Sequence, residues 1–340
     1  QFTVFRSQFD AWFAQEAVDA GAELFTETLV EDLLWEGGRV AGVRTRRGDL
    51  QARVVIGADG VNSTVNEKAG LRDPLAPGEV SLIIRQILDL PSEQIEERFA
   101  LRPGEGALSS FVAPVAGPNG ARGEYYTELY TNNDSLSMTT EARLDVLRDV
   151  GVPSYDMMAA RERHPYIARL IQGTTLREYQ AHLLTWGGVA DLSTLYGDGV
   201  LLAGDAGKFN TSEGVGSWPS MASGLAAART VKRACEMEDF TRTTLAVYLD
   251  FLEEAGLGRV QRESRHAWED ESAFRDIMIQ APAHLFHLAR RYLEEYGVEE
   301  REYPHSFLGE VYHNLIKPHA PWYLRWPLNL AAWVDSTVWQ

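Results

Sequence analysis

Two short stretches of the sequence place an aspartate next to a glycine at the end of an apolar segment. Ala52–Gly57 runs into Ala58-Asp59-Gly60, and Val200–Ala203 runs into Gly204-Asp205-Ala206. An apolar strand that stops at such a turn puts a carboxylate at the carboxyl edge of a sheet, where α/β proteins bind ligands. The adjacent glycines let backbone N–H groups approach a ligand closely. Asp205 could therefore bind a hydroxyl group of a ligand.

A glycine-rich loop and a helix follow the second aspartate. Gly214-Val215-Gly216 leads into the small-residue segment Met221–Ala228. The start of such a helix offers a partial positive charge to a phosphate or to an electron-rich ring. A single Gly-Asp-Ala sequence is more often only a turn. Two such strand ends in one chain favour a ligand site.

The composition excludes several classes of protein. The 340 residues include 49 Asp and Glu against 32 Lys and Arg, so we predict no nucleic-acid partner, which would need clustered basic residues. A single cysteine, Cys235, excludes a disulfide framework and a cysteine-ligated iron–sulfur cluster held by this chain. It fits a cytoplasmic location. The absence of any run of 18 apolar residues predicts that no helix spans a membrane.

The histidines give no strong functional signal. His284, His287 and His313 lack a carboxylate at a ligand spacing, so we predict no metal site. We interpret His164 and His182 as hydrogen-bonded structural histidines in preference to proton-transfer residues. No serine lies in the sequence context of a hydrolase nucleophile. We assign no catalytic residue.

The spacing of apolar residues predicts an α/β fold with an α+β insert. Ser7–Ala20 has helical spacing, and the segment 80–185 alternates in the way typical of antiparallel strands. We expect the insert to be an antiparallel sheet with helices to one side. The predicted strands are Gln1–Phe5, Ala22–Phe25, Val30–Glu36, Arg39–Arg46, Val80–Leu88, Leu108–Ala113, Arg122–Thr131 and Leu136–Thr140, and further helices are predicted at Glu141–Val150, Asp156–Ile171 and Tyr248–Glu254.

The carboxyl-terminal part is predicted to be helical and aromatic. Ala281–Tyr296 is amphipathic, and four of the nine tryptophans lie within the final nineteen residues, at Trp322, Trp326, Trp333 and Trp339. Indole rings favour the boundary between apolar and aqueous phases. The tail is therefore either a surface that contacts a membrane or a segment that packs on the protein or a partner.

The motifs resemble those of a known superfamily. Ala58-Asp59-Gly60-Val61-Asn62-Ser63 resembles the second FAD fingerprint of the flavoprotein hydroxylase and geranylgeranyl-reductase superfamily, and Gly204-Asp205-Ala206 resembles its third. Arg6 and Phe9-Asp10 resemble the segment that opens the helix between these fingerprints. The first fingerprint, Gly-x-Gly-x-x-Gly, is absent, and the opening residues already have the pattern of a strand. We therefore expect that an amino-terminal part of the domain is missing.

Within this superfamily the chain resembles the FixC family, akin to electron-transfer flavoprotein–quinone oxidoreductase. The resemblance covers roughly residues 2 to 235. It is carried by 32–40, 90–99, 104–106, 133–137, 164–167, 178–182 and 195–199. The loop Lys208–Pro219 departs from the pattern, because it is shorter and more polar, with a Glu-Gly-Val core closer to that of the geranylgeranyl reductases.

The resemblance implies FAD as the cofactor. Asp205 would hold the ribityl chain, and Asp59 and Gly60 would lie near the pyrophosphate and ribose. The full set of cofactor-binding residues that it implies is Arg6, Ala58, Asp59, Gly60, Gly204, Asp205, Gly214, Val215 and Gly216. It also implies four segments: parts of the FAD-binding domain at 1–79 and 186–235, an antiparallel-sheet substrate or quinone domain at 80–185, and a helical region at 236–340.

The function implied by the resemblance is electron transfer from an electron-transfer flavoprotein toward a quinone. Because the chain has one cysteine, a separate ferredoxin-like iron–sulfur subunit is implied as a partner. A cytoplasmic location is expected, with attachment to the cytoplasmic membrane surface left open. Two alternatives stay open. One is a geranylgeranyl-reductase-like enzyme that reduces isoprenoid double bonds, and the other is a flavin-free docking or scaffold subunit.

Overall fold

The computed structural model describes residues 4–117, 120–186, 188–189, 191–210 and 216–269. The chain divides into two compact units, Gln1–Arg265 and His266–Gln340. The elements below belong to the first unit, apart from the last residues of the final helix. The predicted amphipathic helix Ala281–Tyr296 and the tryptophans of the tail lie outside the described residues.

The chain opens with helix α1 (Arg6–Asp19), as its apolar spacing predicts. The predicted strand Gln1–Phe5 is wrong where it can be examined, since Val4 and Phe5 are not in a strand and Phe5 forms the N-cap of α1. Ala22–Phe25 is also irregular, and Leu24 and Phe25 are more than half exposed. In the described structure no strand pairs with this segment, so its apolar composition alone does not make a strand.

A small antiparallel sheet follows, with the order β1 (Val30–Glu36), β2 (Arg39–Thr45) and β3 (Gly48–Gln51). Gly37 and Gly38 form the two-residue turn between β1 and β2, both with positive φ. A hairpin turn that matches the twist of the strands needs positive φ at both positions, which glycine adopts without strain. The prediction of this hairpin is confirmed.

The two apolar stretches that end in aspartate lie side by side. Strand β4 (Val55–Gly57) pairs in parallel with β11 (Val200–Leu202), and β10 (Tyr196–Gly197) completes the order β10-β11-β4. Helix α2 (Thr64–Ala69) follows β4, and η3 (Gly204–Gly207) follows β11. Because the strands are parallel, both polar turns leave the same edge of the sheet.

Apolar contacts join this sheet to helices of the carboxyl-terminal half. Helix α7 (Ser217–Met237) and helix α9 (Tyr248–Glu254) share a core with β11. Tyr248 is fully buried, and its hydroxyl donates a hydrogen bond of 2.8 Å to the carbonyl of Leu202. The predicted helix Tyr248–Glu254 is confirmed.

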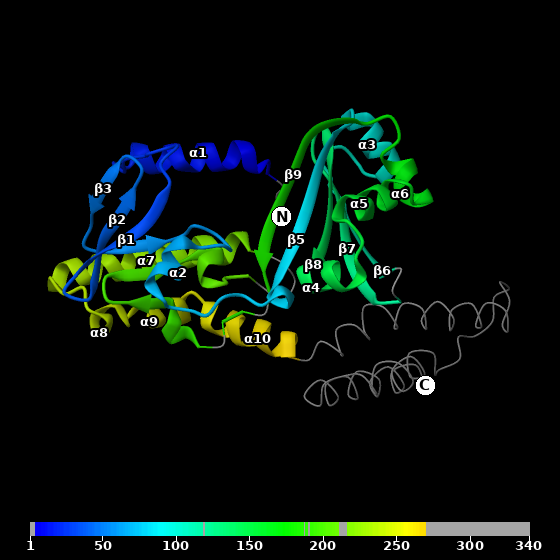
Figure 1. Ribbon diagram of the computed structural model, residues 1–340. Helices are drawn as coiled ribbons and strands as arrows, with labels where there is room; N and C mark the ends of the chain where they lie inside the picture. Colours follow the sequence, from blue (N-terminus) through cyan, green and yellow to red (C-terminus); the bar gives the residue numbers. More distant parts are fainter. Residues whose placement is uncertain (1–3, 118–119, 187, 190, 211–215, 270–340) are drawn as a thin grey trace, which may run out of the picture. The chain divides into compact units, whose positions relative to one another are not determined.

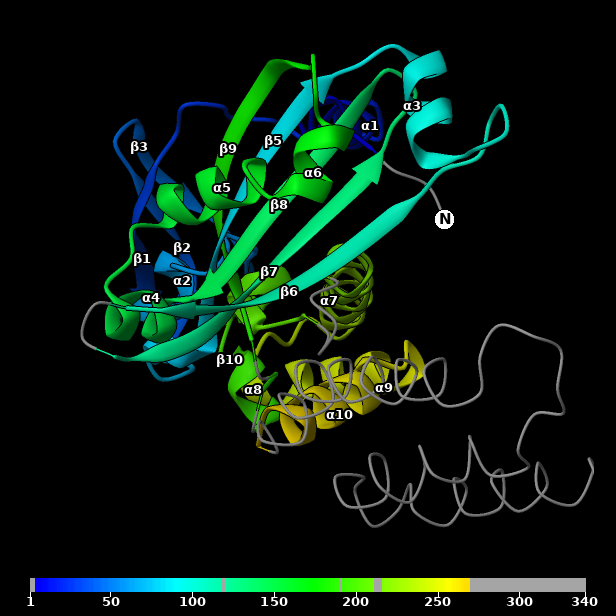
Figure 2. The same cartoon turned by 90° about the vertical axis from the view of Figure 1, so that its right-hand side faces the viewer.

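The segment 80–185 forms a five-stranded antiparallel sheet with the order β6-β7-β8-β5-β9 (Figures 1 and 2). Helices α3 (Ser92–Phe99), α5 (Ser154–Glu162) and α6 (Pro165–Leu170) cover one face. Ile84, Leu88 and Met138 form the core under them. The strands are β5 (Val80–Asp89), β6 (Leu108–Ala116), β7 (Arg122–Thr131), β8 (Ser135–Arg143) and β9 (Thr175–Thr185). The predicted antiparallel sheet with helices to one side is confirmed.

Two details of this sheet differ from the prediction. The predicted helix Glu141–Val150 is wrong at its start, because Glu141–Arg143 belongs to β8 and helix α4 covers only Leu144–Val150. Pairing of these residues with β5 and β7 extends the strand and overrides their helix propensity. Strand β9 was not predicted.

Short elements connect these layers. They are η1 (Pro77–Glu79), η2 (Leu192–Leu195), α8 (Arg242–Leu245) and α10 (Leu257–Glu269). Of the helices that the structure describes, none has the length and apolar character needed to cross a membrane. The four-segment division of the chain stays a prediction.

Candidate functional site

The turns after β4 and β11 form one edge of the candidate site. The N–H of Ala203 donates a hydrogen bond of 2.9 Å to the carbonyl of Gly57, which joins the two strand ends just before the turns. Gly60 and Gly204 both have positive φ, at 81° and 59°. Apart from the two chain neighbours of Gly60, none of the described residues has an atom within 4 Å of the position that a Cβ on Gly60 would take. The backbone at this turn is therefore open to a ligand.

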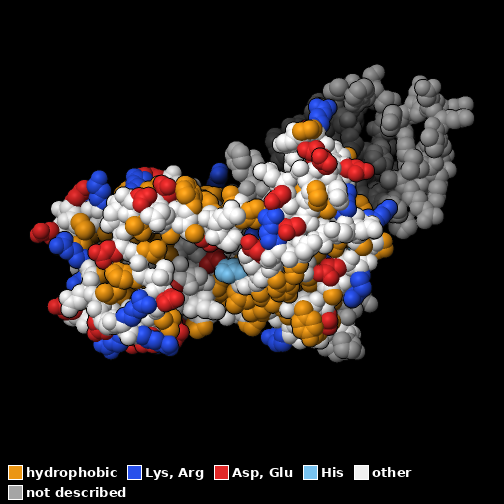
Figure 3. All heavy atoms as spheres, turned by 90° about the horizontal axis from the view of Figure 1, so that it is seen from above, with side chains coloured by type: hydrophobic (Ala, Val, Ile, Leu, Met, Phe, Trp, Pro, Cys, Tyr) orange, Lys and Arg blue, Asp and Glu red, His pale blue; other side chains and the backbone are white. Residues whose placement is uncertain are grey.

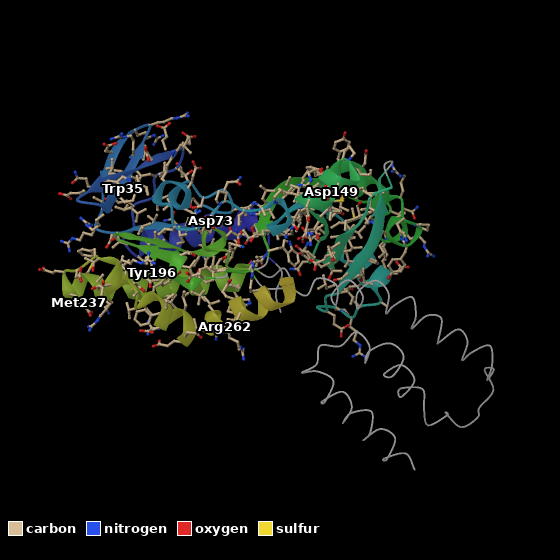
Figure 4. All side chains as sticks on the ribbon, turned by 60° about the horizontal axis from the view of Figure 1, so that its bottom comes forward. Trp35, Asp73, Asp149, Tyr196, Met237 and Arg262 are labelled. Carbon is tan, nitrogen blue, oxygen red and sulfur yellow. The ribbon has the colours of Figure 1, made fainter. Side chains whose placement is uncertain are left out.

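Arg72 ties the two turns together. Its Nε donates to the carbonyl of Ala206 at 2.9 Å, and its Nη2 donates to the carbonyl of Val61 at 3.2 Å. Asn66 Oδ1 accepts the N–H of Arg72 and fixes the base of the arginine. The next residue, Asp73, is exposed (Figure 4). Sequence reasoning missed Arg72, because it lies in an ordinary Gly-Leu-Arg-Asp-Pro turn with no motif of its own.

Asp59 serves the start of helix α2. Its Oδ1 accepts from the hydroxyl of Ser63, and its Oδ2 accepts from the N–H of Val65 at 3.0 Å. Ser63 caps the same helix through its hydroxyl. A carboxylate at a helix N-terminus satisfies free N–H groups and interacts favourably with the helix dipole. Both oxygens of Asp59 are thus already hydrogen-bonded within its own loop.

Asp205 differs from Asp59 in its surroundings. Its side chain is 19% exposed, and no hydrogen bond to its carboxylate is found among the described residues. Burial raises the pKa of Asp205, and the charges of His182 and Arg6 oppose that rise. Its Oδ2 lies 4.0 Å from Nε2 of His182. This carboxylate has free capacity to accept hydrogen bonds from a ligand.

His182 is not the hydrogen-bonded structural histidine that we expected. Its side chain is 68% exposed, and none of the described residues makes a hydrogen bond with its ring. On the face drawn in Figure 3, a histidine side chain (pale blue) lies beside an acidic side chain (red). His164, at the N-cap of α6, is also exposed and makes no capping hydrogen bond through its side chain.

The first turn of α1 lies near Asp205. Arg6 forms an ion pair with Asp10 at 2.7 Å. It also lies close enough to Asp205 for its positive charge to lower the pKa of that carboxyl group. The hydroxyl of Ser7 donates to Glu178 on β9 at 3.1 Å. Residues from the start of the chain, from the five-stranded sheet and from the turn after β11 therefore converge on one site.

The start of α7 borders Asp205 on its other side. A Cβ placed on Gly216, the N-cap of α7, would lie 3.8 Å from Asp205 Oδ1. The N–H of Gly204 donates to the hydroxyl of Ser223 on the same helix at 2.9 Å. Gly214 and Val215, which the resemblance assigns to the cofactor, lie outside the described residues.

Buried polar contacts hold the segment after η3. Lys208, whose side chain is 7% exposed, donates from Nζ to Glu79 at 2.6 Å. Asn210 donates from its amide to the carbonyl of Thr185 at 2.8 Å. Glu79 precedes β5 and Thr185 ends β9. This segment therefore joins the parallel strands to the five-stranded sheet.

The residues present fit an FAD molecule in two respects. Asp205 offers a carboxylate with free acceptor capacity, which suits a ligand hydroxyl. The open turn at Gly60 allows a ligand close to the backbone. Ala58 and Asp59 are exposed at the same edge, so they are accessible to such a ligand. Contacts of each of these residues with a flavin stay predictions. No group of three or more potential metal ligands occurs in the part of the chain that the structure describes.

No family model matches the chain, but curated proteins do. Protein FixC of Escherichia coli strain K12 is 37% identical over 259 residues, which are 75% of this chain and 60% of that protein. Protein FixC of Azotobacter vinelandii is 33% identical over 317 residues, which are 91% of this chain and 72% of that protein. The aligned region thus spans about 60% of the length of the E. coli relative.

Two solved structures share the fold. A geranylgeranyl bacteriochlorophyll reductase-like protein of Thermoplasma acidophilum matches with a TM-score of 0.60 at 20% identity, over 78% of this chain and 63% of that one. A mutant of the halogenase PltM in complex with FAD matches with a TM-score of 0.54 at 16% identity, over 86% of this chain and 61% of that one. The chain therefore shares the fold of these two proteins. Its similarity to the FixC proteins shows that the chain belongs to the FixC family.

Proposed function

We propose that this chain is part of an FAD-dependent oxidoreductase that passes electrons from an electron-transfer flavoprotein toward a quinone. Membership of the FixC family supports the proposal. The structural observation that carries it is the carboxylate of Asp205, which lies at the carboxyl ends of two parallel strands with no hydrogen-bond partner among the described residues. Ligands of open α/β sheets bind at this edge.

The chain's own residues would bind and orient the cofactor. Asp205 Oδ1, on the side of Gly216, would accept a hydrogen bond from a ribityl hydroxyl. Arg72 would keep the two turns at a fixed separation, because it hydrogen-bonds to a backbone carbonyl in each. Bound FAD would supply the redox chemistry, so the protein needs to provide position and electrostatics.

The proposed partners follow from what this chain can hold. Cys235 is exposed and is the single cysteine of the sequence, whereas clusters are held by several cysteine thiolates. We therefore place the iron–sulfur centre on a separate ferredoxin-like subunit. The tryptophan-rich tail supports contact with a membrane surface, where an apolar quinone would be available.

Replacement of Asp205 tests the cofactor proposal. We expect Asp205→Ala to weaken FAD binding about 10- to 100-fold, because a hydrogen bond to a charged group contributes about 1.5–3 kcal/mol. The measurement is a titration of the flavin-free chain with FAD, followed by flavin fluorescence. Asp73→Ala is the matched control, since Asp73 is exposed and its side chain makes no hydrogen bond in the described structure.

Three outcomes would change the proposal. If the unaltered chain binds no FAD, even together with the amino-terminal part of a FixC protein, the flavoprotein proposal fails. If Asp205→Ala binds FAD as tightly as the unaltered chain, Asp205 does not hold the cofactor and the flavoprotein proposal loses its structural support. If Asp205→Ala also leaves the function of the protein unchanged, the scaffold alternative is favoured. If the flavin-loaded protein reduces a geranylgeranyl lipid but not a water-soluble benzoquinone, the electron acceptor in the proposal is an isoprenoid double bond and not a quinone.

A further inference from the structure

The face of the five-stranded sheet that the helices leave open carries His182. Alternate residues of a strand point to opposite faces. Ile84 and Leu88 of β5 pack under the helices, so Ile83 lies on the open face. His182 pairs directly with Ile83 in the β5–β9 register and therefore shares that face. Glu178, four residues earlier on β9, lies on the same side as His182, beside the start of α1.

One charged group, Asp205, faces the imidazole of His182, and charged groups of two further elements lie next to Asp205 or on the same face of β9. Asp205 Oδ2 from η3 is 4.0 Å from its Nε2. Arg6 from α1 acts on the same carboxylate and is itself paired with Asp10. Glu178 on β9 accepts hydrogen bonds from Ser7 and Gln180. Ile83, the partner of His182 on β5, is uncharged.

We infer that His182 transfers a proton to the electron acceptor at this site and that Asp205 orients its ring. The inference rests on the proposed function. Reduction of a quinone to a quinol adds two electrons and two protons. Bound FAD, in its anionic reduced form, would supply both electrons and one proton. The second proton would come from the imidazolium form of His182: the N–H bond on Nδ1, the nitrogen that does not face Asp205, would break as an O–H bond forms on a quinone oxygen. The neutral ring then takes a proton from water, which reaches it because the side chain is 68% exposed.

Other titratable groups of the candidate site are less suited to this step. Both oxygens of Asp59 accept hydrogen bonds within its own loop. Lys208 is buried and paired with Glu79. An arginine such as Arg6 keeps its proton at all ordinary pH values. His182 combines an imidazole, whose ring N–H can be donated, with open access to solvent.

The kinetic test uses the full chain loaded with FAD and reduced with dithionite. We expect His182→Gln to slow reoxidation by a water-soluble benzoquinone about 100-fold or more, the usual contribution of general acid catalysis. FAD affinity should stay within about twofold of the unaltered chain. His164→Gln, which changes the other exposed histidine of the sheet domain, should leave the rate unchanged. Added imidazole should restore much of the rate of His182→Gly, which a purely structural role would not allow.

A second measurement does not depend on activity. Diethylpyrocarbonate should modify His182 and His164 in the flavin-free chain, because both are exposed. FAD together with the benzoquinone should protect His182 at least fivefold and leave His164 reactive, as measured by mass spectrometry of peptides.

The failures of the two proposals are distinguishable. Normal FAD binding with an unchanged rate in His182→Gln, or with no protection of His182, overturns the proton-transfer role and leaves the flavoprotein proposal in place. Loss of FAD binding in His182→Gln would make it a binding residue and would also overturn the role. Absence of FAD binding by the unaltered chain, even together with the amino-terminal part of a FixC protein, would contradict the proposed function itself.

Discussion

Asp59 and Asp205 end strands of the same kind, yet their carboxylates do different things. Both carboxylate oxygens of Asp59 accept hydrogen bonds at the start of α2, one from the hydroxyl of Ser63 and one from the N–H of Val65. Asp205 keeps its oxygens free of hydrogen bonds within the described residues and faces His182. A similar local sequence therefore gives a helix cap in one case and a free acceptor in the other. The difference lies in what packs around each turn.

Glu141 should make the stability of the protein depend on pH. Burial raises its pKa from 4.5 to about 6, with the nearby Glu128 charge adding to the rise and the hydrogen bond from Trp186 opposing it. A carboxyl group whose pKa is raised on folding stabilises the folded state while it is protonated. That contribution is lost as the pH rises through 6. We expect Glu141→Gln to be about 2 kcal/mol more stable than the unaltered chain at pH 8, with the difference falling below about 0.5 kcal/mol at pH 4.5.

Urea unfolding at the two pH values measures this difference. Glutamine keeps an acceptor for the indole N–H of Trp186. The exposed Glu97→Gln serves as the control and should show the same stability as the unaltered chain at both pH values. A gain for Glu141→Gln that is independent of pH would show that ionisation of Glu141 is not its cause.

At the scale of elements, the pair formed by Lys208 and Glu79 connects the turn after β11 to the start of β5. Glu79 also accepts the N–H of Ala76, and its carbonyl accepts the N–H of Trp186 at the end of β9. Hydrogen bonds from Lys208 and Ala76 lower the pKa of Glu79 against the opposing effect of burial. The carboxylate is therefore the charged partner of a mostly buried cation.

Breaking this pair on one side should cost more than replacing both partners. We expect Glu79→Gln to destabilise the chain by about 3 kcal/mol, because it leaves the ammonium of Lys208 buried without its counter-charge. The double variant Glu79→Gln with Lys208→Met should recover most of that loss. Equilibrium unfolding of the four proteins in a double-mutant cycle gives the coupling. Additive effects would mean that the pair does not connect the elements energetically.

The presence of most helices and strands could be predicted from the local sequence pattern, whereas several of their end points could not. Arg122–Thr131 and Val30–Glu36 have the same bounds in the structure as in the prediction. The end of β8 does not, because Glu141–Arg143 is held in a strand by partners on β5 and β7 that a local window does not contain. Strand β9 lies at the edge of its sheet and exposes most of its residues, so it lacks the apolar alternation of a half-covered strand.

Those parts of the candidate site that belong to local motifs were predictable from the sequence. Asp205 and Gly60 each follow an apolar segment, and the structure places both at one edge of the sheet, as that sequence pattern predicts. Arg72 and His182 reach the site through tertiary structure, by hydrogen bonds to two distant turns and by the register of β9 with β5. The polar alternation Glu178, Gln180, His182 was the available signal, because it marks a strand face that no helix covers.

At the scale of the whole molecule, the candidate site joins residues that are far apart in the sequence. Arg6, His182 and Asp205 come from α1, β9 and η3. Contacts of such large sequence separation form only after long segments of chain have been closed, which is entropically costly. Binding of a ligand to this site would therefore stabilise the folded chain by holding these elements together.

Helix α1 carries aromatic side chains that the described residues leave largely exposed. None of the residues of this helix (Figure 1) is buried. The ring of Phe13 stacks on those of Phe9 and Trp12, and the rings of Phe9 and Trp12 meet at a tilted angle. Within the described residues no strand pairs with the outer edge of β4, whose Ile56 is 40% exposed. Uncovered aromatic groups and open strand edges promote colloidal instability.

We therefore expect the isolated chain to elute progressively earlier from a gel-filtration column as its concentration rises. Trp12→Glu should reduce that shift, because it places a charge among the stacked rings. Trp35→Glu, at an equally exposed position on β1, should not (Figure 4). The same shift in both variants would place the adhesive surface elsewhere. Storage and crystallisation of this chain would then depend less on its net charge of −17 than on three rings of one helix.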